Sequence, residues 1–213
     1  MNGAILLAGG HSSRMGRDKA SLSIGGQSLL ERTIAVLIPL TEEIVVMLRK
    51  HQDISYLPRE IHDSIRVGRD RRDARGPLQG IKDGADLLHP SVTRVFVLTC
   101  DLPYLHSAWL KKMQSCMQDD TDIVCSVNGA IANPLIALYR REVLEKAGTA
   151  IKQGKRRPIS LWQGFQVTRL APASGKDRVV TDVNTPEEYQ KAVEYHANMQ
   201  AISPSAPVGQ HSF

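Results

Sequence analysis

The sequence predicts a three-layer α/β domain, in which a mostly parallel, twisted sheet carries helices on both faces. The first observation is that segments of strand length alternate with segments of helical spacing along the chain, the order typical of such domains. The second is that the strand segments are continuous apolar runs, as expected for strands covered on both faces. The third is the length of 213 residues, which favours one domain over two. We expect that domain over residues 1–202.

The first elements predict a β-α-β unit. Residues 3–8 are an uninterrupted apolar run that stops at a Gly-Gly pair, which indicates a buried strand. Ser28 and Glu31 have the spacing of a capping box, and apolar residues at helical spacing follow them. Residues 43–48 predict a second buried strand. The crossover that joins the two strands should therefore be right-handed.

The middle of the chain continues this alternation. Pro77 suits the first position of a helix, because proline lacks the N–H that a first turn leaves unpaired anyway. Residues 92–99 predict the third strand. Ser107 predicts the N-cap of a helix that extends over residues 107–117, and residues 123–127 predict another strand.

The last third of the chain is less regular. Residues 135–139, after Pro134, predict one short strand that pairs antiparallel, because the interval before it holds no crossover helix. Thr185 and Glu188 form a second capping box. The remaining expected elements are helices at 142–147 and 159–162, a strand at 165–170 and a final helix at 185–199. Residues 203–213 have the Ser, Pro and Gly content of a disordered tail.

Composition and charge exclude several classes of protein. The net charge of +5 suits an anionic partner, which can be a nucleic acid, an acidic membrane face or a polyphosphate. No stretch approaches the roughly 18 apolar residues of a membrane-spanning helix, and no secretory signal is evident, so we expect a cytoplasmic protein. The three cysteines lack any C-x-x-C spacing, which argues against both a disulfide framework and a zinc site.

The loop after the first strand is the first candidate for chemistry. Residues 7–19 read LAGGHSSRMGRDK, in which Gly9 and Gly10 let the backbone approach a ligand while Arg14 and Lys19 add positive charge. The spacing matches neither of the two common nucleotide-binding fingerprints. A solvated basic turn is the alternative interpretation. The position directly after a buried N-terminal strand favours phosphate binding.

A second loop carries a single carboxylate. Asp101 follows the third predicted strand, so it should point into the crevice at the carboxyl end of the sheet, where it can bind Mg²⁺. The alternative is that Asp101 shapes a turn before Pro103. Because both loops should meet in one crevice, we favour the metal.

Two further segments are weaker candidates. Asp182 and Asn184 precede the last predicted helix and can face the same crevice, although the capping box beside them already explains part of that motif. Residues 155–157 (KRR) are a basic cluster of a kind that is usually solvated surface. An anionic substrate would give this cluster a function.

The motif L-A-G-G-x-S-S-R-M-G-x-D-K at residues 7–19 resembles the signature of the molybdenum cofactor guanylyltransferases, within the nucleotidyltransferase superfamily. The resemblance implies a Rossmann-like nucleotidyltransferase fold, and it covers nearly the whole chain apart from the tail. Further segments follow in the order of that family, at residues 76–80 (GPLQG), 100–103 (CDLP), 134–139 (PLIALY), 154–157 (GKRR) and 183–187 (VNTPE).

The resemblance implies an activity and a set of site residues. The activity is Mg²⁺-dependent transfer of GMP from GTP to the terminal phosphate of molybdopterin or of its molybdenum-loaded form, with release of pyrophosphate. Expected substrates are therefore GTP and molybdopterin, with transient contacts to cofactor-synthesis or acceptor proteins and with neither nucleic acid nor membrane. The implied residues are Leu7, Ala8, Gly9, Gly10 and Asp63 for the nucleotide, Arg14 and Lys19 for the phosphates, Asp101 for nucleotide and Mg²⁺, and Arg156, Arg157, Asp182 and Asn184 for the pterin.

Three alternatives remain at this point. Cytidylyltransferases of the same cofactor resemble L-A-A-G in the first loop, so Gly9 favours guanine. Sugar-phosphate nucleotidyltransferases are usually longer chains. A non-catalytic nucleotide- or nucleic-acid-binding protein would show salt-dependent binding, but the aromatic pattern of an RNA reader is missing.

The sequence also departs from the family pattern. Residues 47–50 lack the Asn that is common after the second strand, and Asn133 stands where a basic residue or His is more usual. We interpret the charged stretch 66–75 as a loop over the site. The reaction needs no covalent intermediate, because the phosphate of the cofactor is itself the nucleophile. We therefore expect no essential Ser-His or Cys-His pair.

Overall fold

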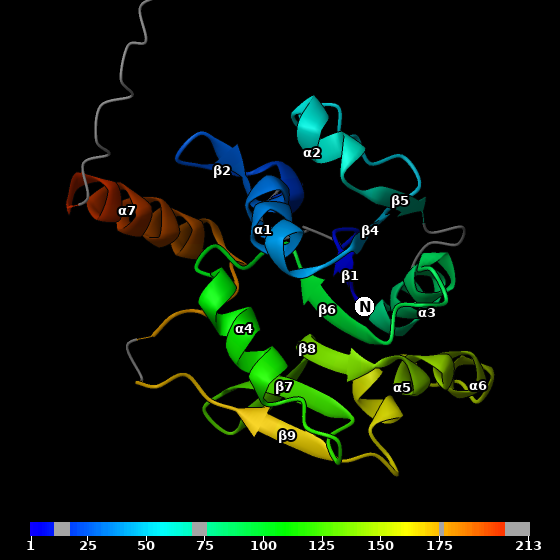
Figure 1. Ribbon diagram of the computed structural model, residues 1–213. Helices are drawn as coiled ribbons and strands as arrows, with labels where there is room; N and C mark the ends of the chain where they lie inside the picture. The colour runs from blue at the N-terminus through cyan, green and yellow to red at the C-terminus, as the bar shows by residue number, and fades with distance from the viewer. Residues whose placement is uncertain (11–17, 70–75, 175–176, 203–213) are drawn as a thin grey trace, which may run out of the picture.

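The computed structural model describes residues 1–10, 18–69, 76–174 and 177–202. Within them a seven-stranded sheet forms the middle layer, in the spatial order β5-β4-β1-β6-β8-β7-β9 (Figure 1). Every neighbouring pair in it is parallel except the two that include β8. The strands are β1 (Asn2–Leu7), β4 (Glu43–Leu48), β5 (Arg66–Arg69), β6 (Arg94–Thr99), β7 (Ile123–Asn128), β8 (Ile131–Arg140) and β9 (Val167–Leu170). The predicted fold class is confirmed.

Helices cover both faces of the sheet. The longer helices are α1 (Leu29–Leu37), α3 (Pro77–Leu87), α4 (Ser107–Ser115) and α7 (Pro186–Ile202). The shorter elements are α2 (Arg59–Asp63), α5 (Arg141–Glu145), α6 (Ala147–Lys152), the 3-10 turns η1 (Lys19–Ser21), η2 (Ile38–Leu40) and η3 (Pro158–Leu161), and a small hairpin of β2 (Ser23–Ile24) and β3 (Gln27–Ser28).

Successive residues of β1 alternate between two hydrophobic cores, as the pleat of a strand requires. Ala4 and Leu6 pack in the core that includes buried residues of α1 and α4. Ile5 packs in the opposite core, which includes buried residues of α3, α5 and α6. A smaller cluster joins α7 to the β2–β3 hairpin. The continuous apolar pattern of the strands therefore reflects burial on both faces.

The helix starts follow from local sequence. At α1 the backbone N–H of Glu31 donates to Ser28 Oγ at 3.1 Å, as the capping box predicts. At α3 Pro77 occupies the first turn. At α4 the prediction of a Ser107 cap is wrong, because His106 Nδ1 accepts from the Trp109 N–H at 3.3 Å and Ser107 is already helical. Histidine is an uncommon cap, so the sequence pattern did not reveal it.

The antiparallel strand is longer than the sequence predicts. β8 covers Ile131–Arg140, whereas the expectation was residues 135–139. The register along β7 slips between Cys125, which faces Ala137, and Ser126, which faces Asn133. This bulge contains Pro134, a residue without a ladder donor that strands accommodate at such irregularities. Because of this bulge, the sequence pattern of the single strand β8 resembles a loop followed by a shorter strand.

The expectation that all of residues 66–75 form a loop is wrong for its first part. Arg66–Arg69 is the edge strand β5, which pairs parallel with β4. Gly68 lies against the sheet so closely that a Cβ there would collide with Met47 and approach Leu87 Cδ1 to 2.8 Å. Charged residues on both sides of it suit an exposed edge. Residues 70–75 and the predicted tail lie outside the described residues.

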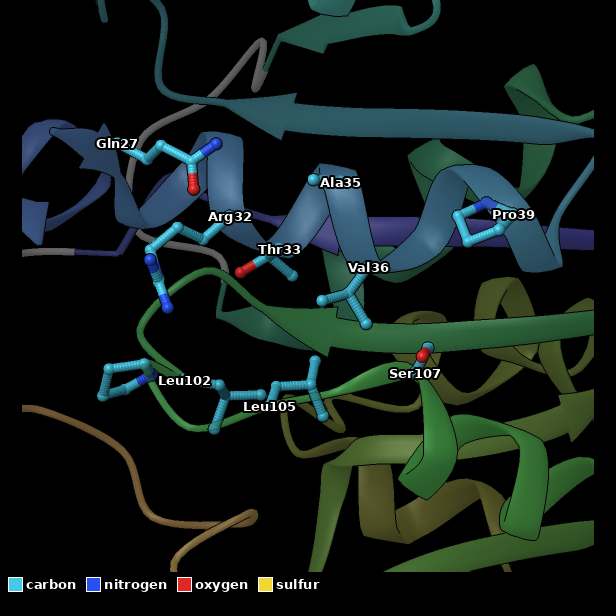
Figure 2. Close-up of a pocket in the computed structure, with 10 residues that line it drawn as sticks. Gln27, Arg32, Thr33, Ala35, Val36, Pro39, Leu102, Leu105 and Ser107 are labelled. Carbon is cyan, nitrogen blue, oxygen red and sulfur yellow. The ribbon is translucent and has the colours of Figure 1, made fainter. Parts of the chain in front are cut away.

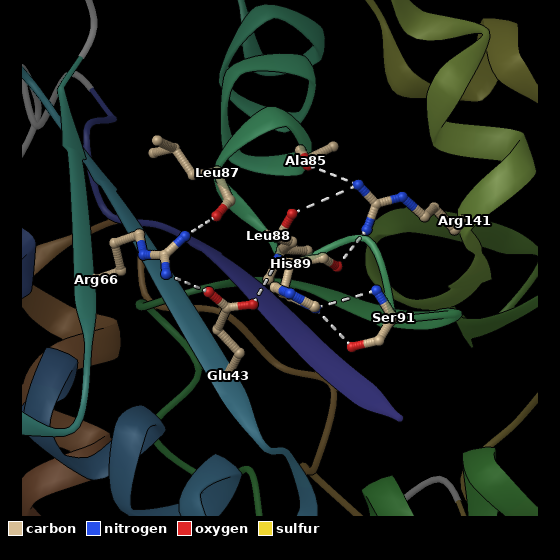
Figure 3. A network of polar contacts seen from close by, with 8 residues as sticks. All are labelled: Glu43, Arg66, Ala85, Leu87, Leu88, His89, Ser91 and Arg141. Carbon is tan, nitrogen blue, oxygen red and sulfur yellow. Dashed lines mark hydrogen bonds and ion pairs between the residues drawn. The ribbon is translucent and has the colours of Figure 1, made fainter.

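A network of polar contacts lies at the amino ends of the strands (Figure 3). Arg66 pairs with Glu43 at 3.0 Å, and the other Glu43 oxygen accepts from the His89 N–H at 2.7 Å. Arg141 Nη1 donates to the carbonyls of His89 at 2.8 Å and Val92 at 3.2 Å. These contacts fix the exit of α3. In the described part of the chain, no helix combines the length and the apolar character that a membrane crossing requires.

Candidate functional site

The two loops that the sequence singled out lie side by side at the carboxyl ends of the parallel strands. β1 and β6 are neighbours in the sheet, with Leu7 level with Thr99. The loop that begins at Ala8 and the segment that begins at Cys100 therefore leave the sheet next to each other. Ligands in open α/β sheets bind at this edge.

Lys19 connects the first loop to the other parts of the site. Its ammonium lies 3.2 Å from Asp101 Oδ2 and donates to Asn184 Oδ1 at 2.6 Å. The side chains of Lys19 and Asp101 are only 16% and 17% exposed, so the charges interact in a partly desolvated environment. Asp18 positions Lys19 at the start of η1, where Asp18 Oδ1 accepts from the Ala20 N–H at 3.1 Å.

The segment before α7 is bound directly to the same site. The Val183 N–H donates to the Asp101 carbonyl at 2.9 Å. Asn184 Nδ2 donates to Asp182 Oδ2 at 2.8 Å, and Glu188 accepts from the Asn184 N–H at 2.6 Å. Three segments that are distant in sequence therefore meet, and four predicted residues come together: Lys19, Asp101, Asp182 and Asn184.

Asp101 also carries an unused acceptor. In the described part of the chain its Oδ1 atom is buried and has no hydrogen-bond partner. Buried polar atoms normally have partners, and carboxylate oxygens are the ligands that Mg²⁺ prefers. The residue therefore fits a divalent cation. The described residues contain no cluster of three or more His, Cys, Asp or Glu side chains that would form an all-protein metal cage. A cation here would share its remaining coordination between water and substrate phosphates, which is how Mg²⁺ is usually held.

The Ala8–Gly10 loop lies directly on the turn after β4. The Ala8 N–H donates to the Met47 carbonyl at 3.0 Å. A Cβ on Gly9 would lie 3.1 Å from the Arg49 nitrogen, tighter than a normal contact. A Cβ on Gly10 would meet nothing within 4 Å among the described residues. A side chain at Gly9 would therefore require the backbone at Arg49 to shift, whereas nothing in the described part of the chain occupies the space beside Gly10.

Several residues that support this site escaped the sequence reasoning. Arg49 pairs with Asp18 at 3.5 Å, and Gln52 Nε2 donates to the Ala8 carbonyl at 3.0 Å. Arg69 Nη1 donates to the carbonyls of residues 49, 50 and 52. All three side chains lie at or after the carboxyl ends of β4 and β5. Their position after the carboxyl ends of these strands, where ligands bind in open α/β sheets, is the feature of the sequence that could have identified them.

The basic loop at residues 155–157 lies at the start of α3. The Leu78 N–H donates to the Arg156 carbonyl at 3.4 Å, and Gly76 has a φ of +79° that brings it against the same carbonyl. Because α3 follows the parallel strand β5, this helix start belongs to the same sheet edge as Asp101. Arg156 and Arg157 are exposed, and no contact joins either of them to Lys19 or Asp101 in the described part of the chain.

Two other predicted residues stand apart. Asp63 ends α2 just before β5 begins, which places it toward the amino end of that strand, where it is exposed and pairs with Arg59 at 3.5 Å. The structure does not bring it to the Ala8–Gly10 loop. Arg14 lies outside the described residues.

Hollows lined by described residues lie near this arrangement. One of about 980 Å³ lies beside the ends of β4 and β5, lined in part by Met47, Lys50 and Arg69. Another, of about 260 Å³, lies between α1 and the segment that follows Asp101 (Figure 2). Arg32 extends from α1 toward that segment. Burial lowers its pKa below the ordinary value.

The thiol next to Asp101 is not set up as a nucleophile. Cys100 is 5% exposed, and burial raises its pKa far above the ordinary value, with the neighbouring Asp101 charge acting in the same direction. A thiol of this kind stays protonated at neutral pH, and only a thiolate attacks efficiently. The site therefore offers a cation and backbone amides, which bind phosphates, and a carboxylate, which can hold a divalent cation.

Comparison with known proteins agrees with this chemistry. The family model described as "MobA-like NTP transferase domain" matches residues 4–173. A protein of Vibrio vulnificus named molybdenum cofactor guanylyltransferase is 30% identical over 185 residues, which are 86% of this chain and 91% of that protein. A protein of Mycobacterium bovis named probable molybdenum cofactor guanylyltransferase is 30% identical over 203 residues, 92% of each chain.

Solved structures share the fold. A molybdopterin-guanine dinucleotide biosynthesis protein A from Archaeoglobus fulgidus aligns with a TM-score of 0.74 at 20% identity, covering 93% of this chain and all of that one. A 2-C-methyl-D-erythritol 4-phosphate cytidylyltransferase from Thermus thermophilus aligns with a TM-score of 0.68 at 17% identity, covering 92% and 100% of the two chains. Identities this low establish the architecture alone.

Proposed function

The chain belongs to the family of MobA-like NTP transferase domains, and from that premise we propose that it transfers GMP from GTP to the terminal phosphate of molybdopterin or of its molybdenum-loaded form, releasing pyrophosphate. The observation that carries the proposal is the meeting of Lys19 with Asp101 and Asn184 beside the Ala8–Gly10 loop. The names of the relatives supply the base and the acceptor.

The proposed step is a displacement at the α-phosphorus of GTP. An oxygen of the pterin phosphate forms a bond to that phosphorus, and the bond to the bridging oxygen of pyrophosphate breaks. The electron pair leaves with pyrophosphate. The protein has to hold two polyanions together and neutralise the charge that develops on the leaving group. Lys19, which contacts Asp101 and Asn184, would be the cation in this role.

Asp101 would hold Mg²⁺ through its unused Oδ1 oxygen. When bound, the ion supplies neutralisation of phosphate charge. Asp101 would thus act on the phosphates through the ion that it holds, whereas the Lys19 ammonium would contact phosphate oxygens directly. Gly9 and Gly10 would bring backbone N–H groups to the nucleotide, together with Leu7 and Ala8 at the end of β1.

The second substrate would lie on the side of Asp182 and Asn184, with Arg156 and Arg157 as charges for its phosphate. Support comes from the shared sheet edge, where the start of α3 and the Asp101 segment both lie. Arg14 would extend the positive lining along the triphosphate. Asp63 is the weakest member of the proposed set, because it lies toward the opposite end of β5.

Pyrophosphate release with a panel of nucleotides tests the proposal. Purified protein is incubated with molybdopterin, Mg²⁺ and GTP, CTP or ATP in separate reactions. The proposal predicts pyrophosphate with GTP only when molybdopterin is present. Release with CTP in preference to GTP would assign the chain to the cytidylyl branch. No release with any nucleotide, from protein that is folded by circular dichroism, would overturn the proposed activity.

A further inference from the structure

Gln52, in the turn after β4, binds the backbone of the Ala8–Gly10 loop through its side chain. Its side chain is almost fully buried, at 6% exposure. The amide Nε2 donates to the Ala8 carbonyl at 3.0 Å, while the amide Oε1 accepts from the Arg49 N–H at 3.1 Å. One side chain therefore satisfies both a carbonyl of the loop and an amide of the turn after β4.

The turn that carries Gln52 is itself fixed. Arg69 Nη1 donates to the carbonyls of Arg49 at 3.1 Å, Lys50 at 3.3 Å and Gln52 at 2.9 Å. The Gln52 N–H also donates to the Arg49 carbonyl at 3.2 Å. Because these bonds hold the turn to the end of β5, the amide of Gln52 is a fixed anchor for the loop.

The same turn also supports Lys19. The Arg49 guanidinium pairs with Asp18, the residue that caps η1 and precedes Lys19. The turn at residues 49–52 therefore touches both parts of the proposed phosphate site, the loop through Gln52 and the cation through Arg49 and Asp18.

We infer that Gln52 is a positioning residue for nucleotide binding, which sets the orientation of the Ala8–Gly10 backbone and touches no substrate itself. The inference rests on the proposed function, since the loop is the part of the site assigned to the nucleotide. A backbone site loses affinity when its peptide planes rotate, and the Ala8 peptide is the one that Gln52 fixes. A small misplacement of binding groups can cost on the order of 100-fold in rate.

Two substitutions remove the donor to Ala8 in different ways. Gln52→Met keeps the approximate volume without polar atoms, and Gln52→Glu keeps an acceptor for the Arg49 N–H but has no donor at neutral pH. The matched control is Gln114→Met, which removes a half-buried glutamine amide that donates to the Leu40 carbonyl at 3.5 Å, away from the site. Binding of GTP is measured by calorimetry with each folded variant, well below its thermal midpoint, and steady-state kinetics follow.

The inference predicts that both Gln52 variants raise the Kd and the KM for GTP about tenfold, the range of one lost buried hydrogen bond. The KM for molybdopterin should stay within twofold of the parent value, and Gln114→Met should leave both constants unchanged. A purely structural role would lower the thermal midpoint and leave the GTP affinity of the folded variants at the parent value, which would overturn the inference. If the parent protein binds CTP instead of GTP, the guanylyl assignment fails while the same comparison with CTP still decides the role of Gln52. If the parent protein binds no nucleotide, both the proposed function and the positioning role of Gln52 are wrong.

Discussion

The Lys19 ammonium is shared between side chains from distant parts of the chain. Its partners Asp101 and Asn184 lie 82 and 165 residues away in sequence. An exposed ion pair would contribute little, but the low exposure of these groups strengthens their interaction. The position of each residue after a predicted strand or before a predicted helix was visible in the sequence. The distances that join them depend on the order of strands in the sheet, which periodicity does not encode.

Asp101→Asn tests the carboxylate. The change preserves shape but removes the charge that holds Lys19 and, by our proposal, Mg²⁺. We expect turnover to fall by at least about 100-fold, the scale of a lost electrostatic contact in a transition state, when activity is measured well below the thermal midpoint. That midpoint should also fall, because Lys19 loses its partly buried counter-charge. Asp86→Asn, on an exposed ion pair with Lys82, is the control and should keep parent activity. Activity of Asp101→Asn within twofold of the parent would contradict the assigned role.

Two of the residues that sequence reasoning missed share one property. Gln52 and Arg69 donate to backbone carbonyls. A carbonyl is present at every position, so no residue pattern marks which one needs a partner. The roles of Gln52 and Arg69 follow only from the structure, in which the turn after β4 contacts the Ala8–Gly10 loop.

At the scale of elements, the long and fully buried segments were predictable and the short or exposed ones were not. β1, β4, β6 and α1 follow the apolar pattern because each is covered by a core. β5 escaped prediction because it is a four-residue edge strand in which Arg66 and Arg69 are exposed. The β2–β3 hairpin, with two residues in each strand, is too short for any periodicity to show.

The C-terminal helix α7 is held by a histidine. His196 Nε2 lies 2.8 Å from the Pro103 carbonyl, an acceptor, so this nitrogen carries the proton and Nδ1 is left to accept from Arg32 at 3.1 Å. Tyr104 stacks on the same imidazole at a centroid distance of 6.0 Å. Burial lowers the pKa of His196 below its ordinary value of 6.5, and the Arg32 charge lowers it further.

This geometry predicts a pH dependence of stability. Because the folded pKa is below the unfolded one, the unfolded chain binds the proton more readily, and the free energy of unfolding falls as the pH drops below the ordinary pKa of 6.5. Thermal melts from pH 8 to pH 5 on the parent and on His196→Gln measure the effect. The parent should lose more stability than the variant over that range. Parallel curves would show that His196 does not control the docking of α7.

A substitution in the network at the amino ends of the strands should lower the stability of the protein without changing its affinity for GTP. Arg141 donates to carbonyls at the exit of α3, where a cation is favourable. Arg141→Ala should lower the free energy of unfolding by about 0.5–1.5 kcal/mol, because exposed and part-buried carbonyls at the exit of α3 lose their donor. The GTP affinity of the folded variant should equal that of the parent, since the network lies at the far end of the sheet. Denaturant unfolding and calorimetry measure the two quantities, and a weaker GTP affinity would contradict the separation.

For the whole molecule, the sheet separates two tasks. Its amino ends carry the Glu43, Arg66 and Arg141 network, which stabilises the exit of α3, and its carboxyl ends carry the groups that we propose to bind phosphate. The net charge of +5 left three kinds of anionic partner open. Lys19, partly buried between Asp101 and Asn184 beside a glycine loop, suits the small polyphosphate that our proposal assigns to this site.

The most direct test follows the α-phosphate of GTP. GTP carrying radioactive phosphorus at that position is incubated with the protein, Mg²⁺ and molybdopterin, and the products are separated. Direct transfer predicts that the label appears in a pterin dinucleotide in an amount equal to the unlabelled pyrophosphate released, and that none stays on the denatured protein. Label that remains bound to the protein, or that appears only as free GMP, would contradict direct transfer at the site formed by Lys19 and Asp101.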